Sequence, residues 1–218
     1  MLDKLGWVMR ICALVVAALA TTPAAADSDN GDSWSKGLNI RLRGIAVLPN
    51  DSADISVIGG DIDIDNAYVP ELDLSWFFTE NIATELVLAT TKHDARAVNT
   101  AIGNVDVGEF WLLPPTLLLQ YHLPLAGGLK PYVGAGINYT IVYNQDAAGG
   151  TVTDLDIDNG FGYALQIGVD YFIDESWHVN FDVKRLWLNL DGELNNGAIA
   201  ADIDVDPWIV GLGVGYRF

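Results

Sequence analysis

The end of the chain, residues 207–218, alternates between two kinds of side chain. Bulky apolar and aromatic residues occupy one parity, whereas the other parity carries mostly glycine and a single charge. The first set is Trp208, Val210, Leu212, Val214, Tyr216 and Phe218, and the second is Ile209, Gly211, Gly213, Gly215 and Arg217. A period of two is typical of a β-strand. Because the apolar face ends on aromatics and a tilted membrane-spanning strand needs about 9–11 residues, we interpret this stretch as a strand that faces lipid.

Residues 1–26 have the three parts of an export signal. Lys4 and Arg10 give a positive start, residues 11–20 are apolar, and the alanines at 24–26 match a cleavage site. The apolar run is shorter than the about 20 residues that a membrane helix needs. It contains Cys12, the single cysteine of the sequence, so we expect no disulfide, thiol catalysis or cysteine-bound metal in the exported chain. Residues 27–218 are then expected to form one domain.

The chain is both acidic and hydrophobic. It has 29 Asp and Glu against 11 Lys and Arg, a net charge of −18, and 50% of its residues are hydrophobic. Such a negative balance repels phosphates, so we exclude nucleic acid as a partner. The high hydrophobic content argues against disorder. With no later apolar run long enough for a membrane helix, two classes remain, a secreted β-sandwich and an outer-membrane β-barrel.

Eight segments of the chain alternate in the same way as its end. They are residues 37–48, 67–78, 82–91, 109–122, 129–143, 161–171, 177–187 and 207–218. The connections between them are alternately long and short, and aromatic residues gather beside both kinds. A sandwich has no reason to order aromatics in this way, whereas a barrel places them at two membrane interfaces. We therefore predict an all-β fold, an eight-stranded antiparallel transmembrane β-barrel with short periplasmic turns and long external loops.

Two places in these segments depart from regular alternation. Pro70 has no N–H for a strand ladder, so we expect a bulge or a strand end near it. Residues 185–187 lose the phase of the alternation, which indicates a second bulge.

Several stretches resemble the OmpW family of small outer-membrane proteins. They are Leu113-Pro114-Pro115-Thr116 with Gln120-Tyr121, then residues 130–140 (KPYVGAGINYT), Gly168-Val169-Asp170-Tyr171, Val69-Pro70-Glu71 and the closing residues 213–218. The resemblance implies an eight-stranded barrel that admits small hydrophobic molecules and releases them sideways through an opening in its wall. It also places the chain in the outer membrane of a Gram-negative bacterium, in a family with members associated with alkane import.

Charged residues share the parity that faces the predicted lumen. They are Arg41, Arg43, Glu71, Asp73, Glu85, Asp170, Asp182, Lys184 and Arg217. An eight-stranded barrel is just wide enough for side chains to fill it, and unpaired buried charges are costly. We therefore expect a lumen filled by ion pairs, with Asp170 and Arg217 as one possible pair, and no wide water pore.

Aspartates also alternate with aliphatic residues just before strands that return to the membrane. The clearest candidates for cation binding are Asp61, Asp63, Asp65, Asp154, Asp156 and Asp158, and residues 202–206 repeat the pattern. One interpretation is strand extensions above the bilayer with a wet acidic face; the other is capture of Ca²⁺ or Mg²⁺ shared with lipopolysaccharide phosphates. Continuing strand parity puts Ile62, Ile64, Leu155 and Ile157 outside but Ile203 and Val205 inside. At least one bulge must therefore intervene.

Two further sets of residues are candidates for specific roles. Pro70, Pro114 and Pro115 cannot donate ladder hydrogen bonds, so they mark the places where the wall could open. Tyr216 and the terminal Phe218 resemble the signal that the barrel-assembly machinery reads.

The residues give no indication of catalysis. His93, His122 and His178 fall at strand ends or on inward faces, and none has a serine nucleophile placed beside it, so we interpret them as polar filling. We predict no enzyme and no cofactor, but a barrel for passive uptake of small apolar solutes in contact with outer-membrane lipid and lipopolysaccharide. The alternative is a structural barrel whose acidic loops bind divalent cations, lipopolysaccharide or a macromolecular partner without transport.

Overall fold

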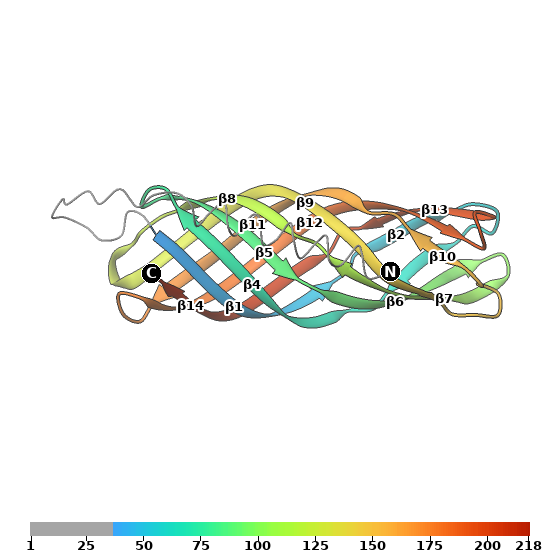
Figure 1. Ribbon diagram of the computed structural model, residues 1–218, viewed down its shortest axis with the longest axis horizontal. Helices are drawn as coiled ribbons and strands as arrows, with labels where there is room; N and C mark the ends of the chain where they lie inside the picture. The colour runs from blue at the N-terminus through green and yellow to red at the C-terminus, as the bar shows by residue number, and fades with distance from the viewer. Residues whose placement is uncertain (1–36) are drawn as a thin grey trace. The chain divides into compact units, whose positions relative to one another are not determined.

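The computed structural model describes residues 37–218, which are almost entirely β-strand (Figure 1). The predicted export signal, residues 1–26 with Cys12, lies outside the described residues. The strands are β1 (Gly37–Leu48), β2 (Asp51–Ile55), β3 (Asp61–Ile64), β4 (Ala67–Phe77), β5 (Ile82–Ala89), β6 (Thr91–Thr100), β7 (Gly103–Leu113), β8 (Thr116–His122), β9 (Leu129–Ala147), β10 (Leu155–Ile157), β11 (Gly160–Phe172), β12 (Trp177–Leu194), β13 (Ile199–Val205) and β14 (Trp208–Arg217). A short 3-10 helix, η1 (Ala126–Gly128), precedes β9. Within residues 37–218, no helix has the length and apolarity to cross a membrane.

Eight of these strands close into an antiparallel barrel, as predicted from the sequence. The order is β1, β4, β5, β8, β9, β11, β12 and β14, and β14 pairs back onto β1. The closing strand is paired along its whole length, from Trp208 opposite Leu48 to Arg217 opposite Asn39. Its glycine-rich parity faces inward beside β1, where a Cβ on Gly213 would overlap the carbonyl oxygen of Leu42 and lie 2.7 Å from Cγ of Arg43.

The predicted external loops are themselves largely β-strand and continue the wall beyond the barrel. They form two sheets. One contains β2, β13, β10 and the outer half of β12; the other contains β3, β6, β7 and the outer half of β9. For the alternating aspartates, this arrangement has the geometry of the interpretation that they lie on strand extensions above the bilayer. Such strands have one face in water and an apolar face on the other side.

The polarity of the wall inverts where the barrel passes into this extension. In β12, Asp182 and Lys184 point inward below the transition, and Leu186, Leu188 and Leu190 point inward above it. The predicted bulge at residues 185–187 is wrong, because β12 pairs with β11 in one unbroken register through this region. The loss of regular alternation in the sequence marks the level at which the inward-facing side chains change from charged to apolar.

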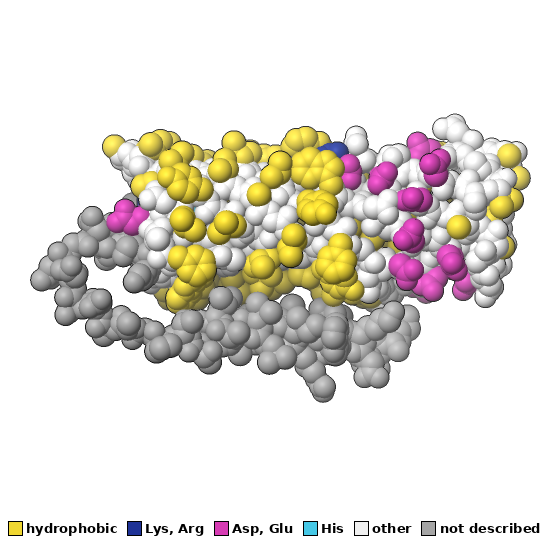
Figure 2. Space-filling view, turned by 90° about the horizontal axis from the view of Figure 1, so that it is seen from above, with side chains coloured by type: hydrophobic (Ala, Val, Ile, Leu, Met, Phe, Trp, Pro, Cys, Tyr) yellow, Lys and Arg dark blue, Asp and Glu magenta, His cyan; other side chains and the backbone are white. Residues whose placement is uncertain are grey.

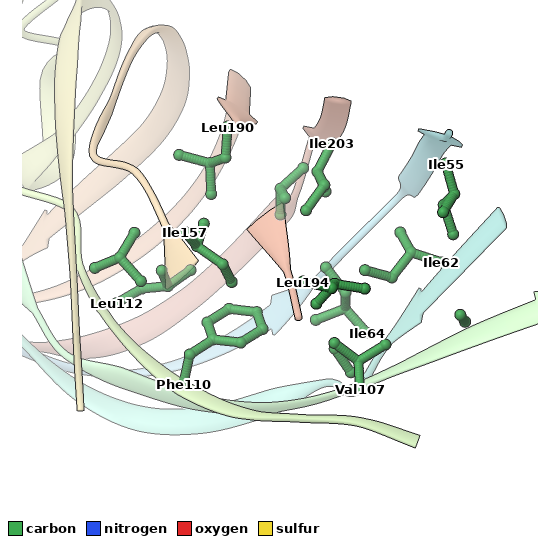
Figure 3. Packing of buried hydrophobic residues seen from close by; sticks show 14 of the residues in the cluster. Ile55, Ile62, Ile64, Val107, Phe110, Leu112, Ile157, Leu190, Leu194 and Ile203 are labelled. Carbon is green, nitrogen blue, oxygen red and sulfur yellow. The ribbon is translucent and has the colours of Figure 1, made fainter. Parts of the chain in front are cut away.

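The external interior is a hydrophobic core between the two sheets (Figure 3). Ile203 and Val205 are inside, as expected. Ile62, Ile64 and Ile157 are also buried in this core and Leu155 packs against it, so the outward placement expected from strand parity is wrong for these four residues. The expected bulge supplies the reason. Glu71 is opposite Ala89, and Ile64 is opposite Ala95. The interval from Ile64 to Glu71 is therefore one residue longer than the interval from Ala89 to Ala95, and this extra residue turns the isoleucines of β3 to the inside.

The outer surface of the wall divides into two zones (Figure 2). On the face that Figure 2 shows, hydrophobic side chains cover the half at the C-terminal end of β14, and carboxylates gather over the other half. Large apolar residues on the first zone are half exposed or more, among them Phe161, Leu165, Ile167, Leu212 and Phe218. A surface of this kind suits lipid contact, with the acidic zone above the membrane.

Candidate functional site

Arg41 occupies the centre of the barrel lumen and is fully buried. Its Nη1 lies 3.0 Å from Oε1 of Glu85, and its Nη2 lies 2.6 Å from Oδ2 of Asp170. Nη1 also donates to Oγ of Ser75 at 2.7 Å, and the guanidinium lies 5.4 Å from the ring centroid of Tyr132. The two carboxylates therefore come from strands on different sides of the barrel, and Arg41 joins them across it.

Arg43 and Lys184 form a second group, one layer farther out along the strands. Arg43 contacts Asp73 through Nε at 2.7 Å, Glu71 through Nη2 at 3.0 Å and Asp182 through Nη1 at 3.2 Å. Lys184 Nζ lies 2.7 Å from Glu71 and 2.8 Å from Asp182. All five side chains are buried. Arg43 Nη2 is also 3.5 Å from Glu85, which links this group to the first.

These eight residues make what we term the charged floor. Its members are Arg41, Arg43, Glu71, Asp73, Glu85, Asp170, Asp182 and Lys184. The ninth residue predicted for the lumen, Arg217, is at the periplasmic end, with its guanidinium 4.7 Å from the ring centroid of Phe77. The structure pairs Asp170 with Arg41, at 2.6 Å, and the pairing of Asp170 with Arg217 stays a prediction.

Neutral amides complete the floor, and the sequence analysis did not single them out. Gln120 and Gln166 both donate through Nε2 to Oε2 of Glu85, at 2.5 and 2.8 Å. Asn180 donates through Nδ2 to Oδ1 of Asp170 at 2.8 Å. Their position on the inward parity of β8, β11 and β12 was the available signal. The two glutamines satisfy Oε2 of Glu85, whereas Asn180 shares Oδ1 of Asp170 with Nε of Arg41, so the lumen is filled at this level.

The three histidines lie inside the structure. The ring of His122 stacks on Tyr132 at 4.7 Å between centroids, and the ring of His178 stacks on Phe172 at 4.6 Å. His93 belongs to the external extension, where its Nδ1 lies 2.8 Å from the carbonyl oxygen of Asp65.

An apolar pocket lies directly on the charged floor. Glu71 and Lys184 form part of its lining, and its volume is about 40 Å³. The other walls come mainly from aliphatic side chains of the upper lumen, among them Ile45, Val47, Val87, Leu186, Leu188 and Ile209. Of the residues that line the pocket, the sequence singled out Pro114, Glu71 and Lys184, but it did not indicate which aliphatic side chains surround them.

The threonines that border the apolar pocket are already hydrogen bonded within the protein. Thr116 donates through Oγ1 to the carbonyl of Pro114 at 3.0 Å, and Thr140 donates through Oγ1 to Oδ1 of Asn138 at 2.7 Å. A polar solute would have to break such bonds to gain a partner here. The lining therefore favours an apolar occupant.

The wall beside the pocket has an interrupted strand ladder. β5 and β8 are paired up to Thr116, and β6 and β7 resume pairing at Leu112. Pro114 and Pro115 lie between these points, where neither has an N–H to donate. On the other side, the N–H of Tyr139 donates to the carbonyl of Pro115 at 3.1 Å, so this segment stays attached to β9.

The same interval is also unpaired on its other edge. β4 and β5 are paired up to Glu71 opposite Ala89, and Pro70 follows immediately. Pro70 remains paired with Gly44 of β1, so the interruption faces β5 alone. The prolines predicted as weak points of the wall thus flank one short interval around Thr90.

The six aspartates considered for cation binding lie in the external extension. Oδ1 of Asp61 accepts hydrogen bonds from the N–H groups of Ala53 and Ile62, and Oδ2 of Asp154 accepts one from the N–H of Asn196. Among residues 37–218, no three carboxylates or histidines are gathered in a way that could hold a metal ion.

Known proteins match this chain over the whole of its described part. The sequence profile of the OmpW family matches residues 35–218. An uncharacterized outer-membrane protein, y4mB of Sinorhizobium fredii, is 45% identical over 98% of this chain and 94% of its own. Outer membrane protein W of Vibrio cholerae is 33% identical over 95% and 98%. The crystal structure of OprG from Pseudomonas aeruginosa superposes with a TM-score of 0.76 at 26% identity, covering 84% of this chain and 97% of OprG.

Proposed function

We propose a function from the premise that this chain belongs to the OmpW family and is an outer-membrane barrel of a Gram-negative bacterium. The barrel lets small apolar solutes cross the outer leaflet and releases them sideways into the bilayer. The observation that carries the proposal is the position of the apolar pocket. It lies on top of the charged floor and beside the unpaired interval of the wall.

The charged floor gives a solute in the pocket no favourable way down. To pass toward the periplasm, an apolar molecule would have to separate buried ion pairs and displace the amides that satisfy them, and it could offer neither group a partner. Lipid lies on the other side of the wall. Moving apolar surface from water into pocket and then lipid is favourable by roughly 25 cal/mol per Å², so the route needs no energy source.

The unpaired interval supplies the way out. Separating two strands normally breaks a row of backbone hydrogen bonds, but near Pro70, Pro114 and Pro115 part of that row is already missing. We propose that a solute leaves the pocket here, past Thr90.

Restoring backbone donors in this interval should slow the passage of solutes. We expect Pro114→Val/Pro115→Val to lower the uptake of an apolar fluorescent dye toward the level of cells without the protein, because the new N–H groups can pair across the gap. Dye fluorescence in cell membranes measures the rate. Pro131→Val is the matched control, since Pro131 lies in β9 opposite Val169 and away from the pocket.

The outcomes also separate the two candidate functions. If cells with and without the wild-type protein take up every apolar dye equally, the transport proposal is wrong and a structural barrel is favoured. If the wild type transports and the double valine variant does so equally fast, the exit is elsewhere.

The charged floor also predicts poor conduction of ions. In a planar lipid bilayer, we expect the purified protein to give only small and irregular currents, because paired side chains and amides fill the lumen. A wider, water-filled porin run in parallel gives the comparison. Large, steady currents through this protein would show that the floor does not close the lumen.

We also infer a role in assembly for the end of the chain. Tyr216 and Phe218 pack edge to face at 4.8 Å between centroids and are on the lipid side of the wall. We propose that they carry the signal read by the barrel-assembly machinery, with deletion of Phe218 impairing membrane insertion.

A further inference from the structure

The external wall forks just above the apolar pocket. β1 and β4 are paired up to Val47 opposite Ala67, but the strands that continue them diverge. β2 pairs with β13 in one sheet, and β3 pairs with β6 in the other. In the order of paired strands within residues 37–218, β2 and β3 stand at opposite ends. We call this splayed hairpin, residues 51–64, the fork.

Two aspartate side chains bridge the fork in place of a backbone ladder. Oδ2 of Asp51 accepts a hydrogen bond from the N–H of Ile64 at 2.8 Å, and Oδ1 of Asp61 accepts one from the N–H of Ala53 at 2.8 Å. Each carboxylate thus reaches from its own strand to the backbone of the other. Side-chain bridges of this kind can be released without dismantling either sheet.

The interior behind the fork is apolar and leads to the pocket. Ile55 of β2 and Ile62 and Ile64 of β3 are buried there, facing the hydrophobic core (Figure 3). Pro49, which lines the apolar pocket, lies two residues before Asp51. A solute that passed between β2 and β3 would therefore meet these isoleucines first, and Leu112, Leu188 and Val205 of the same core line the pocket.

The outer tip of the extension offers a longer and more obstructed route. There the N–H of Ala101, in the connection of β6 to β7, donates to the carbonyl of Ile58, in the connection of β2 to β3, at 2.9 Å. Below the tip, the core continues through Val152, Leu194 and Ile203, all buried. A solute from this direction would have to part the full depth of the core.

We propose that the fork is the gate through which apolar solutes enter, with Asp51 and Asp61 as its latch; this inference rests on the uptake function proposed above. When the two carboxylates release the opposing N–H groups, β2 moves with its sheet and β3 with the other. The gap admits the solute to the apolar interior directly above the pocket, and the latch then closes behind it.

The electrostatics of the latch favour reversible opening. Burial raises the pKa of the Asp51 carboxyl above its ordinary value, and the nearby carboxylates of Asp63 and Asp61 raise it further, against the hydrogen bonds from the backbone N–H groups of Asp51 and Ile64 that lower it. The ionised carboxylate is thus less favourable in the closed fork than in water. Opening relieves that cost, which offsets part of the loss of the two hydrogen bonds.

A cross-link across the fork tests the gate directly. Ser52 and Asp63 are exposed and lie between the two latch bonds, so Ser52→Cys/Asp63→Cys leaves both latch residues in place. The single native cysteine, Cys12, lies in the predicted export signal. A short bismaleimide is applied to intact cells after the protein has folded. We expect uptake of an apolar dye to fall to the level of cells that lack the protein.

The control places the same reagent within one sheet. Asp54 and Asp202 are opposite each other in β2 and β13, and both are exposed, so cross-linked Asp54→Cys/Asp202→Cys should transport as fast as the untreated variant. Uptake that persists after the fork is cross-linked overturns the gate but not the transport function. Absence of uptake before cross-linking, in the wild type as well, refutes the transport function itself.

Removing the two carboxylates of the latch should have the opposite effect on the rate of dye uptake. Asp51→Ala/Asp61→Ala should raise the rate of dye uptake above that of the wild type, with folding checked by the heat-dependent shift of the barrel on gel electrophoresis. A folded variant with an unchanged or lower rate contradicts the role of the two aspartates.

Discussion

Replacing Ile209 by tryptophan should abolish the uptake of apolar solutes while the barrel still folds. Ile209 points inward from β14 and lines the apolar pocket, where only 6% of its surface is exposed. The pocket has a volume of about 40 Å³, so the larger indole ring would occupy the space that a solute needs. Overpacking of this kind typically costs about 1–3 kcal/mol.

The neighbouring residue gives a matched control. Val210 has the opposite parity and belongs to the lipid-facing surface near Trp208, where an aromatic side chain is favourable at the membrane interface. We expect Val210→Trp to take up the dye at the wild-type rate. Both variants are compared at equal amounts of folded protein in the outer membrane. Wild-type uptake by Ile209→Trp would show that solutes do not pass through this pocket.

The membrane half of the fold could be predicted from residue parity alone. In that half, lipid contacts one face of every strand and a charged lumen contacts the other, so apolar residues mark the outside consistently. The eight strands of the closed barrel followed from that rule. The same rule placed Arg41 and Arg43 inside, and it does not depend on knowing which strands are neighbours.

Parity failed beyond the membrane for a physical reason. Above Lys184 the solvent changes from lipid to water, so the apolar face of a strand turns inward although the strand itself continues. The sequence shows this only as a loss of phase at Leu186, which we interpreted as a bulge. One real irregularity lies between β3 and β4, and others interrupt the pairing of β6 with β7 and of β7 with β9. The first has no distinctive residue, because Asp65 and Asn66 would also suit a loop.

The sequence predicted that ion pairs fill the lumen, but it did not predict which residues pair. Parity placed five carboxylates and four bases in one lumen, but the partners depend on the stagger of strands that are distant in sequence. Asp170 and Arg41 are 129 residues apart and meet because the barrel closes. The apolar pocket depends on the same closure, since its lining comes from strands at both ends of the chain.

Replacing Arg43 by methionine should destabilise the barrel more than any other single change in the floor. Arg43 contacts Asp73, Glu71 and Asp182, which are all buried. Removing one partner of a buried ion pair typically costs about 3–5 kcal/mol, because the remaining charge is left without compensation. The free energy of unfolding, from urea titration of the protein in lipid vesicles followed by tryptophan fluorescence, measures the loss.

A second substitution, added to Arg43→Met, identifies which buried carboxylate has lost its compensating charge. After Arg43→Met, Glu71 and Asp182 still have Lys184, at 2.7 and 2.8 Å, whereas within the described residues the ion pair of Asp73 is with Arg43 alone. Adding Asp73→Asn should therefore recover most of the lost stability, and adding Asp182→Asn should recover little. Equal recovery by both would mean that the floor distributes its charge over the whole network. In that case Lys184 compensates all three carboxylates together, and no single ion pair determines the stability of the closed lumen.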